Sequence, residues 1–196
     1  APHVLGVQEA LHDQLVFLDA RLPHHQRLGE GRDGGERGEH AALYVDTTRF
    51  QVTASGTFWL SPTPDVVGSV GWDAALTRIC TWASLRDRTS ARTLTVWNVH
   101  FDHRGAEARR RSAELVAQRL RAMPGPHVVL GDCNAGEGSP PLDALQAAGL
   151  RDTFRDLHGG SRDVGTYHAF RGGTDGDKID YVLAEAELVT EQAAIL

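Results

Sequence analysis

The sequence is poor in cysteine and lysine, and it has no long apolar segment. Its 196 residues include two cysteines and a single lysine, Lys178. No apolar run reaches membrane-spanning length, and no basic-then-apolar signal segment opens the chain, so we expect no membrane span. The formal net charge of -6 argues against a protein that binds nucleic acid along its whole length without sequence preference, because such a protein would need a basic surface.

The two cysteines, Cys80 and Cys133, have neither the spacing of a zinc site nor that of a redox pair. Both fall in expected buried strands, so we predict two free core thiols. This leaves the compartment open, because a cytoplasmic protein and an exported one whose signal had been removed would look alike. The length fits one domain covering residues 1–196, and there is no internal repeat or linker.

Periodicity predicts an alternation of strands and helices. A helix over residues 11–22 is indicated by leucines at helical spacing, and residues 40–45 and 50–60 have the pattern of a hairpin. The other expected strands are residues 4–7, 77–85, 93–101, 128–130 and 178–183, and the other expected helices are 106–123 and 141–148. The glycine-rich run 29–38 is interpreted as a surface loop, and residues 165–170 as a candidate site loop.

The most informative stretch is residues 127–134, a buried strand that runs into Gly-Asp-Cys-Asn. Asp132 and Asn134 are two residues apart, so their side chains should point the same way. An aspartate can hold or deprotonate a water, and an asparagine can donate to an oxyanion. Both could instead be turn residues that satisfy local backbone groups.

Other polar side chains stand at the ends of expected strands. Glu9 follows the first strand, where it could be a functional carboxylate or an ordinary first-turn helix residue. Asn98, His100 and Asp102 share one strand face, so they must be satisfied or functional. Asp180 interrupts an apolar strand, where an unpaired carboxylate is costly, and we expect a histidine or a cation as its partner.

Four motifs follow one another along the chain, namely Gln8-Glu9, Asn98-Val99-His100, Gly131-Asp132-Cys133-Asn134 with Ser139-Pro140, and Lys178-Ile179-Asp180-Tyr181-Val182-Leu183. Together they resemble the endonuclease/exonuclease/phosphatase superfamily, which includes repair nucleases, sphingomyelinases, inositol polyphosphate phosphatases and nocturnin-like deadenylases. The wider sequence looks most like an uncharacterised bacterial branch near the nocturnin-like enzymes, over essentially the whole chain.

The resemblance implies an α/β fold, a four-layer sandwich of two facing mixed sheets with helices outside and the site at one end. It also implies metal-dependent hydrolysis of phosphoesters, normally with Mg²⁺ and with Mn²⁺ as a substitute. By its match to the motifs, Glu9 would bind the metal. His100 would contact the scissile phosphate, and Glu39 would orient His100.

The resemblance gives the remaining motif residues roles as well. Asp132 would position or deprotonate the attacking water, Asn134 would hold that water or a phosphate oxygen, and Asp180 would orient a catalytic histidine. Such a set is chemically coherent, because Mg²⁺ prefers carboxylate oxygens and polarises the phosphoryl group.

Three residues that flank the motifs, Arg78, His103 and His168, are candidates for substrate contacts, although a purely structural role stays open for each. The expected partner is a phosphoester, either a nucleic acid or a small phosphorylated molecule. The acidic balance favours a small phosphoester or a short single strand over long duplex DNA. We expect a monomer.

Two family features have no counterpart among the 196 residues, namely an opening strand that bears an asparagine and a closing Ser-Asp-His segment. We therefore expect the chain to be part of a longer protein that lacks its first and last strands here, and to hydrolyse weakly or not at all by itself. The alternative function is a non-catalytic binding module on the same scaffold.

Overall fold

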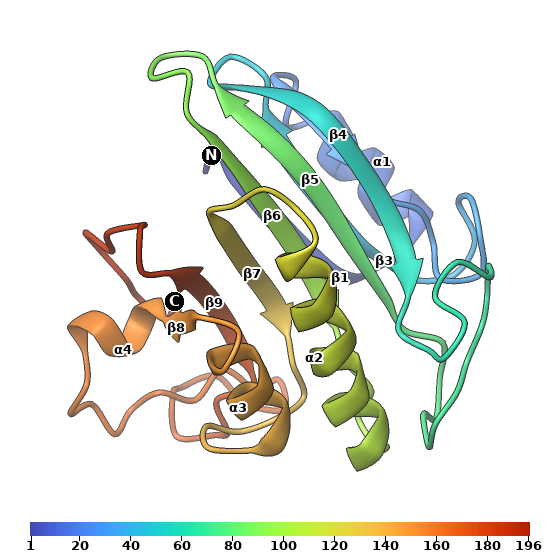
Figure 1. Ribbon diagram of the computed structural model, residues 1–196, viewed down its shortest axis with the longest axis vertical. Helices are drawn as coiled ribbons and strands as arrows, with labels where there is room; N and C mark the ends of the chain where they lie inside the picture. Colours follow the sequence, from blue (N-terminus) through green and yellow to red (C-terminus); the bar gives the residue numbers. More distant parts are fainter.

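Two β-sheets lie face to face in the computed structural model, which describes residues 1–196, and helices cover their outer surfaces (Figure 1). The elements in chain order are β1 (Val4–Ala10), α1 (His12–Asp19), β2 (His25–Leu28), β3 (His40–Asp46), β4 (Phe50–Trp59), β5 (Ile79–Asp87), β6 (Thr93–His100), α2 (Ala106–Arg121), β7 (His127–Asp132), α3 (Pro140–Gln146), β8 (Leu150–Asp152), α4 (Thr153–Leu157) and β9 (Asp180–Glu185).

The smaller sheet has the strand order β1-β3-β2 and is antiparallel. The larger sheet has the order β4-β5-β6-β7-β9-β8, and its one parallel pair is β6 with β7. A parallel pair needs a long crossover connection, which α2 supplies. The carboxyl ends of β6 and β7 therefore reach the same end of the sandwich.

Apolar side chains fill three interfaces between the four layers. Leu15 of α1 packs on Ala42 and Tyr44 of the smaller sheet. Leu43 and Leu85 belong to the cluster between the two sheets. The largest cluster lies between the six-stranded sheet and helices α2 and α3, and it includes Phe58, Trp97, Val116, Leu142 and Leu183. The expected four-layer α/β sandwich is confirmed.

Asn98 joins the two sheets through a buried amide. Its Nδ2 donates to Ala42 O at 2.8 Å and to Val7 O at 3.1 Å, and its Oδ1 accepts from Gln8 Nε2 at 2.6 Å. A buried polar group is tolerated when its hydrogen bonds are made. Asn98 is thus a satisfied structural residue that holds β1 and β3 against β6.

Two expectations about the first half of the chain are wrong. Residues 40–45 and 50–60 do not form a hairpin, because β3 pairs with β1 and β2, whereas β4 pairs with β5. The turn between β3 and β4 carries the chain from one sheet to the other. The first helix ends at Asp19 rather than near residue 22, and Leu11 is half exposed, so its stripe of leucines is only partly buried.

Other expectations agree with the structure. Helix α2 has a buried stripe and a face of arginines, as its pattern indicates. Cys80 and Cys133 are free and buried, so the prediction of two core thiols is confirmed. None of the four helices combines the length and apolar character that crossing a bilayer requires.

Candidate active site

Three candidate residues meet at the end of the sandwich where β1, β6 and β7 finish. Ligand atoms of Glu9, His100 and Asp132 all lie within 4.8 Å of one another. His100 and Asp132 are register partners, each at the last position of its strand. Strand pairing therefore places two of the three side chains next to each other, and the facing sheet supplies the third.

Glu9 reaches this cluster because β1 is irregular at its end. The register with β3 shifts between Val7 and Ala10, and Glu9 has a φ of 59°. This left-handed conformation is uncommon for a glutamate and costs about 1–3 kcal/mol. The Glu9 side chain is 70% exposed, and its Oε1 lies 3.8 Å from Nε2 of His100. Glu9 lies outside α1, so it is not a first-turn helix residue.

His100 lies between the carboxylates and a buried arginine. Nη1 of Arg78 is 2.9 Å from both ring nitrogens of His100, and Nη2 of Arg78 is 3.1 Å from Nδ1 of His103. Burial lowers the pKa of His100 to about 3, and the positive charges of Arg78 and Arg32 add to the effect. His100 is therefore neutral at pH 7.

Asp132 lies on the other side of the imidazole and faces Asp180. Its Oδ2 is 3.6 Å from Nε2 of His100, and its Oδ1 accepts a hydrogen bond of 2.7 Å from the backbone N–H of Asn134. Asp180 is the register partner of Asp132 across β7 and β9. Burial raises the pKa of Asp132 to about 7, and the Asp180 carboxylate adds to that increase.

Asn134 and Asp180 complete this side of the site. Asn134 has a φ of 46°, and its Nδ2 donates to Phe101 O at 3.0 Å, which ties the turn after β7 to the segment after β6. Asp180 forms no ion pair, so the expected histidine or cation partner is not found. Burial raises the pKa of Asp180, against a lowering by its hydrogen bond with Thr166.

Two other candidates lie elsewhere than expected. No hydrogen bond or ion pair joins Glu39 to His100; Glu39 accepts a hydrogen bond of 2.6 Å from Nη1 of Arg32, and Arg78 is the residue that contacts the His100 ring. His168 does not line the cavity beside Asp132; its Nδ1 accepts from the backbone N–H of Gly172, and it lines a neighbouring cavity.

A cavity of about 610 Å³ opens in front of these side chains, and Glu9, Arg78, His103, Asp132, Asn134 and Asp180 are among its lining residues. Tyr167 and Phe170 from the candidate site loop also line it. Phe170 is fully exposed and has a φ of 61°. Sequence reasoning missed Arg32, because the glycine-rich run that contains it gives no sign that it folds back toward a strand end.

The donor set fits a divalent cation. Glu9 and Asp132 offer carboxylate oxygens, which Mg²⁺ and Mn²⁺ prefer, and the neutral imidazole of His100 beside them adds no positive charge that would repel an ion. The exposed side chain of Glu9 has room to adjust to an ion.

The profile of the Endonuclease/Exonuclease/phosphatase family matches residues 1–196. The chain belongs to this family. The resemblance drawn from four short motifs is thereby confirmed. No curated protein sequence matches the chain.

Solved structures of the Endonuclease/Exonuclease/phosphatase family share the fold. A Bacteroides vulgatus protein described as an endonuclease/exonuclease/phosphatase is 34% identical, with a TM-score of 0.83 over 93% of this chain and 73% of that one. The mannosyl-6-phosphatase of Bacteroides thetaiotaomicron is 32% identical, with a TM-score of 0.79 over 94% and 71%. The catalytic domain of human nocturnin, 19% identical, shares the fold with a TM-score of 0.69 over 94% and 69%.

Proposed function

We propose that the chain hydrolyses phosphoesters with the help of a divalent metal ion, Mg²⁺ or Mn²⁺. The observation that carries the proposal is the convergence of Glu9, His100 and Asp132, whose ligand atoms lie within 4.8 Å of one another beside a cavity. Three segments far apart in the sequence supply these residues. A purely structural role would not call for an exposed, strained glutamate at the same point.

Each residue has a role that its position supports. Glu9 would hold the metal, and Asp132 lies close enough to share it. Asp132 also positions the attacking water, and Asn134 holds that water or a non-bridging oxygen of the phosphoryl group. A bound divalent ion would polarise the phosphoryl oxygen and stabilise the leaving oxygen.

A second group of residues supplies donors to the phosphoryl oxygens. Arg78 is fixed by contacts with His100 and His103 and by the Asp102 carboxylate, 3.7 Å from its Nε. Its guanidinium therefore needs little reorganisation when charge develops on the phosphoryl group. Neutral His100 can donate one N–H to the same oxygens. Asp180 faces Asp132 and helps to hold the proton or water there.

A small phosphoester is the substrate class that the surface charge favours. Arg110 and Arg111 of α2 form ion pairs with Glu107 and Glu114, so they neutralise acidic neighbours rather than offer a free basic stripe to duplex DNA. The mannosyl-6-phosphatase relative acts, by its description, on a phosphorylated sugar. We therefore place sugar phosphates first among the compounds to test.

The test is a hydrolysis assay on a panel of sugar 6-phosphates, p-nitrophenyl phosphate, bis-p-nitrophenyl phosphate and single-stranded DNA. Turnover should require Mg²⁺ or Mn²⁺ and stop with EDTA. Asp132→Asn and Glu9→Gln should each reduce kcat by about 100-fold or more, as loss of a group that acts in the transition state does. The control is Asp65→Asn, because Asp65 is an exposed carboxylate paired only with Arg119. Turnover that survives EDTA or Asp132→Asn would refute the proposal.

The binding-module alternative is separated by metal titration followed through thermal melting. A folded-state metal site should gain about 2.7 kcal/mol of stability at a hundredfold excess of ion over Kd, and Glu9→Ala should abolish the gain. Metal-dependent stabilisation without turnover on any member of the panel would favour the binding module.

A further inference from the structure

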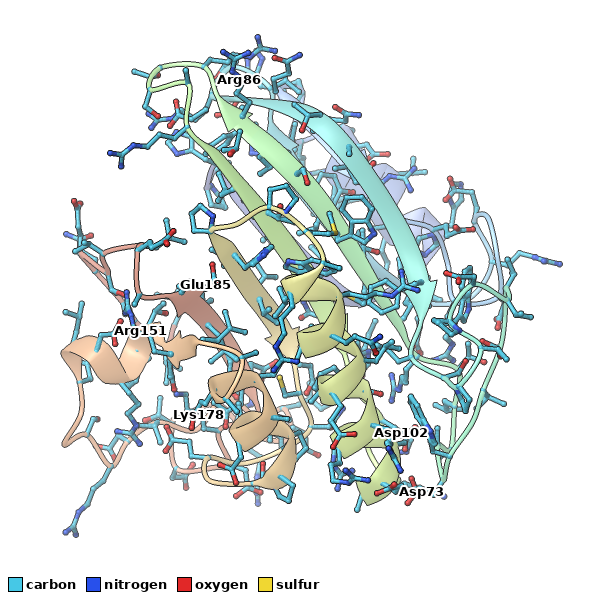
Figure 2. All side chains as sticks on the ribbon, viewed as in Figure 1. Asp73, Arg86, Asp102, Arg151, Lys178 and Glu185 are labelled. Carbon is cyan, nitrogen blue, oxygen red and sulfur yellow. The ribbon has the colours of Figure 1, made fainter.

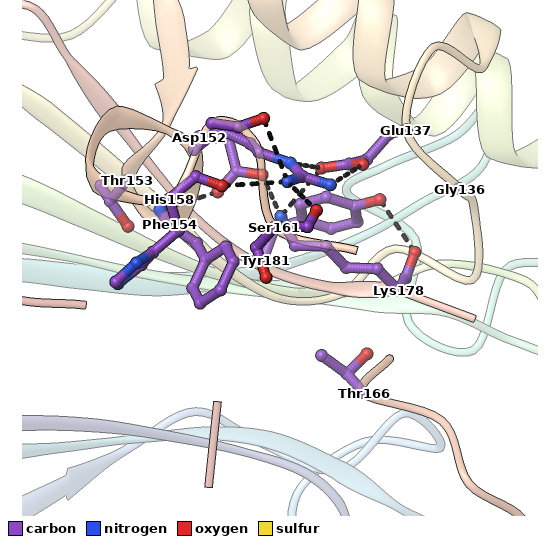
Figure 3. A network of polar contacts seen from close by, with 12 residues as sticks. Gly136, Glu137, Asp152, Thr153, Phe154, His158, Ser161, Thr166, Lys178 and Tyr181 are labelled. Atoms are coloured by element: carbon purple, nitrogen blue, oxygen red, sulfur yellow. Dashed lines mark hydrogen bonds and ion pairs between the residues drawn. The ribbon is translucent and has the colours of Figure 1, made fainter. Parts of the chain in front are cut away.

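The only lysine of the chain, Lys178, is buried two residues before the start of β9, where it belongs to a network of polar contacts (Figure 3). Lys178 is 6% exposed, and its Nζ donates to the carboxylates of Asp152 and Glu137, the latter at 3.2 Å. A buried ammonium group is costly unless paired carboxylates compensate for its lost hydration. Two carboxylates from separate segments meet that requirement here.

Glu137 is held from its other side by Arg155. Nε and Nη2 of Arg155 donate to the two carboxylate oxygens of Glu137, both at 2.7 Å, and Nη1 donates to Ser161 O at 2.8 Å. This forked arrangement fixes the orientation of the Glu137 carboxylate. The Lys178 ammonium also lies 4.7 Å from the centre of the Tyr181 ring. These contacts hold the side chains of Glu137, Lys178 and Arg155 in fixed positions relative to one another.

The network spans the two segments that carry proposed catalytic groups. Glu137 comes three residues after Asn134, in the turn that follows β7. Lys178 comes two residues before Asp180, at the entrance of β9. The ion pair between Glu137 and Lys178 therefore connects one carboxylate-bearing segment to the other.

Two further bonds join the same segments. The backbone N–H of Cys133 donates to Ile179 O at 2.9 Å, and the hydroxyl of Tyr181 donates to Ala135 O at 3.1 Å. These bonds are neutral and near the strand ends, whereas the ion pair reaches farther along the turn. Without it, no side-chain hydrogen bond or ion pair would join the turn residues after Ala135 to the segment that leads into β9.

We propose that Lys178 is a positioning residue that sets the spacing between the Asp132–Asn134 turn and Asp180 by joining Glu137 to Asp152. It touches neither the metal-binding cluster nor the cavity in front of it. Lys178 should therefore affect turnover only by positioning the Asp132–Asn134 turn and Asp180, and this consequence rests on the proposed function. Displacement of a reacting group by about 1 Å can lower a rate by about 100-fold, so a geometric role is sufficient.

The main test variant is Lys178→Met combined with Asp152→Asn, which removes the buried charge pair together and leaves Glu137 paired with Arg155. Replacing both charges avoids the penalty of leaving one buried and unpaired. Glu137→Gln is a milder second variant that keeps Lys178 paired with Asp152 and weakens the contacts of the turn with Lys178 and Arg155. It decides the question if the double variant does not fold. Lys178→Arg is the conservative variant that should restore the link.

The matched control is Arg49→Met with Asp87→Asn. This ion pair, 2.6 Å between Nη2 and Oδ2, lies at the opposite end of the six-stranded sheet. It tests whether loss of any ion pair of the sheet has the same effect.

Two measurements are needed, amide hydrogen exchange by NMR and steady-state kinetics on the best substrate of the panel. The amides of Cys133 and Asn134 should exchange about tenfold faster or more in the double variant, and faster in Glu137→Gln, but not in the control. The kcat should fall by about 10- to 100-fold with KM changed by less than about twofold, and Lys178→Arg should recover most of it.

The positioning role is overturned, whatever the kinetics show, if the amides of Cys133 and Asn134 exchange in the double variant at the same rate as in the wild type. If only Glu137→Gln folds, the same comparison is made with that variant. Accelerated exchange with unchanged kcat would overturn it as well. If the wild-type chain hydrolyses nothing, the proposed function fails, and amide exchange alone then decides whether Lys178 sets the spacing.

Discussion

Removal of the Asp102 carboxylate should be among the most damaging single changes outside the apolar core. Asp102 is 1% exposed, and its two oxygens accept four backbone N–H bonds, from Ala75 at 3.1 Å, Leu76 at 3.2 Å, Arg104 at 2.9 Å and Gly105 at 2.7 Å. These bonds hold the loop before β5 against the segment that leads into α2. Hydrogen bonding by these four amides also contributes to a pKa of about 2 for Asp102.

The size of the effect follows from the number of amides that lose their acceptor. Each bond contributes about 1 kcal/mol net, so Asp102→Ala should cost about 4 kcal/mol of unfolding free energy. Asp102→Asn keeps one of the two acceptor oxygens and should cost about 2 kcal/mol. For a domain of this length each kcal/mol lowers Tm by about 2–4 °C, so Asp102→Ala should melt roughly 8–16 °C below the wild type.

The assay is urea unfolding followed by tryptophan fluorescence, with Asp73→Ala as the control. Asp73 lies beside Asp102 at the start of α2 (Figure 2) and accepts from two amides, those of Glu107 at 3.3 Å and Ala108 at 2.6 Å. By the same count, its two bonds should contribute about 2 kcal/mol, half the value for Asp102. The reasoning is refuted if Asp102→Ala shifts the urea midpoint no more than Asp73→Ala at equal slope.

Three further predictions concern the strand end, the site loop and the ion-pair network. Gly131→Ala should lower the unfolding free energy by several kcal/mol in urea unfolding, because Gly131 has a φ of 127° and an added Cβ would lie 2.1 Å from Val99 O. A decrease of less than about 1 kcal/mol would contradict this. Phe170→Ala should leave Tm unchanged, since Phe170 is fully exposed, but should raise KM for substrates that present a ring face; equal KM values would count against contact with the substrate. The hydrogen bonds from Arg155 lower the pKa of Glu137 to about 2, so the stability that the Glu137 carboxylate contributes should be complete above pH 4.5 and lost as the pH falls toward 2. Glu137→Gln should therefore make the unfolding free energy less dependent on pH in that range, and an unchanged pH profile would show that the pair of Glu137 and Arg155 contributes nothing.

The parts of the fold that sequence reasoning predicted well are those set by local patterns. The apolar run before Asp132 and the amphipathic pattern of α2 predict β7 and a long helix. Which strands β3 and β4 pair with could not be predicted in the same way. A turn between two strand patterns looks the same whether the chain folds back on its neighbour or crosses to another sheet, because burial against distant residues decides between them.

The candidate site was predictable in its members but not in its contacts. Motif order identified Glu9, His100 and Asp132, and the structure brings them together. The left-handed conformation of Glu9 leaves no signal in the sequence, because the surrounding sheet enforces it. The contact of Glu39 with Arg32 depends on how a glycine-rich loop folds back, which periodicity does not describe.

Because β6 and β7 are parallel, both carry their proposed site residues at the same end of the larger sheet, and the two ends of the molecule should tolerate insertions differently. The turns that follow β5 and α2 lie at the end opposite Glu9, and the polypeptide reverses there without contributing a side chain to the cavity. Insertions, labels or immobilisation tags placed in residues 88–92 would thus sit a full strand length away from the chemistry. The opposite rim has less freedom, since the connections that follow β1, β6 and β7 begin there, directly after Glu9, His100 and Asp132.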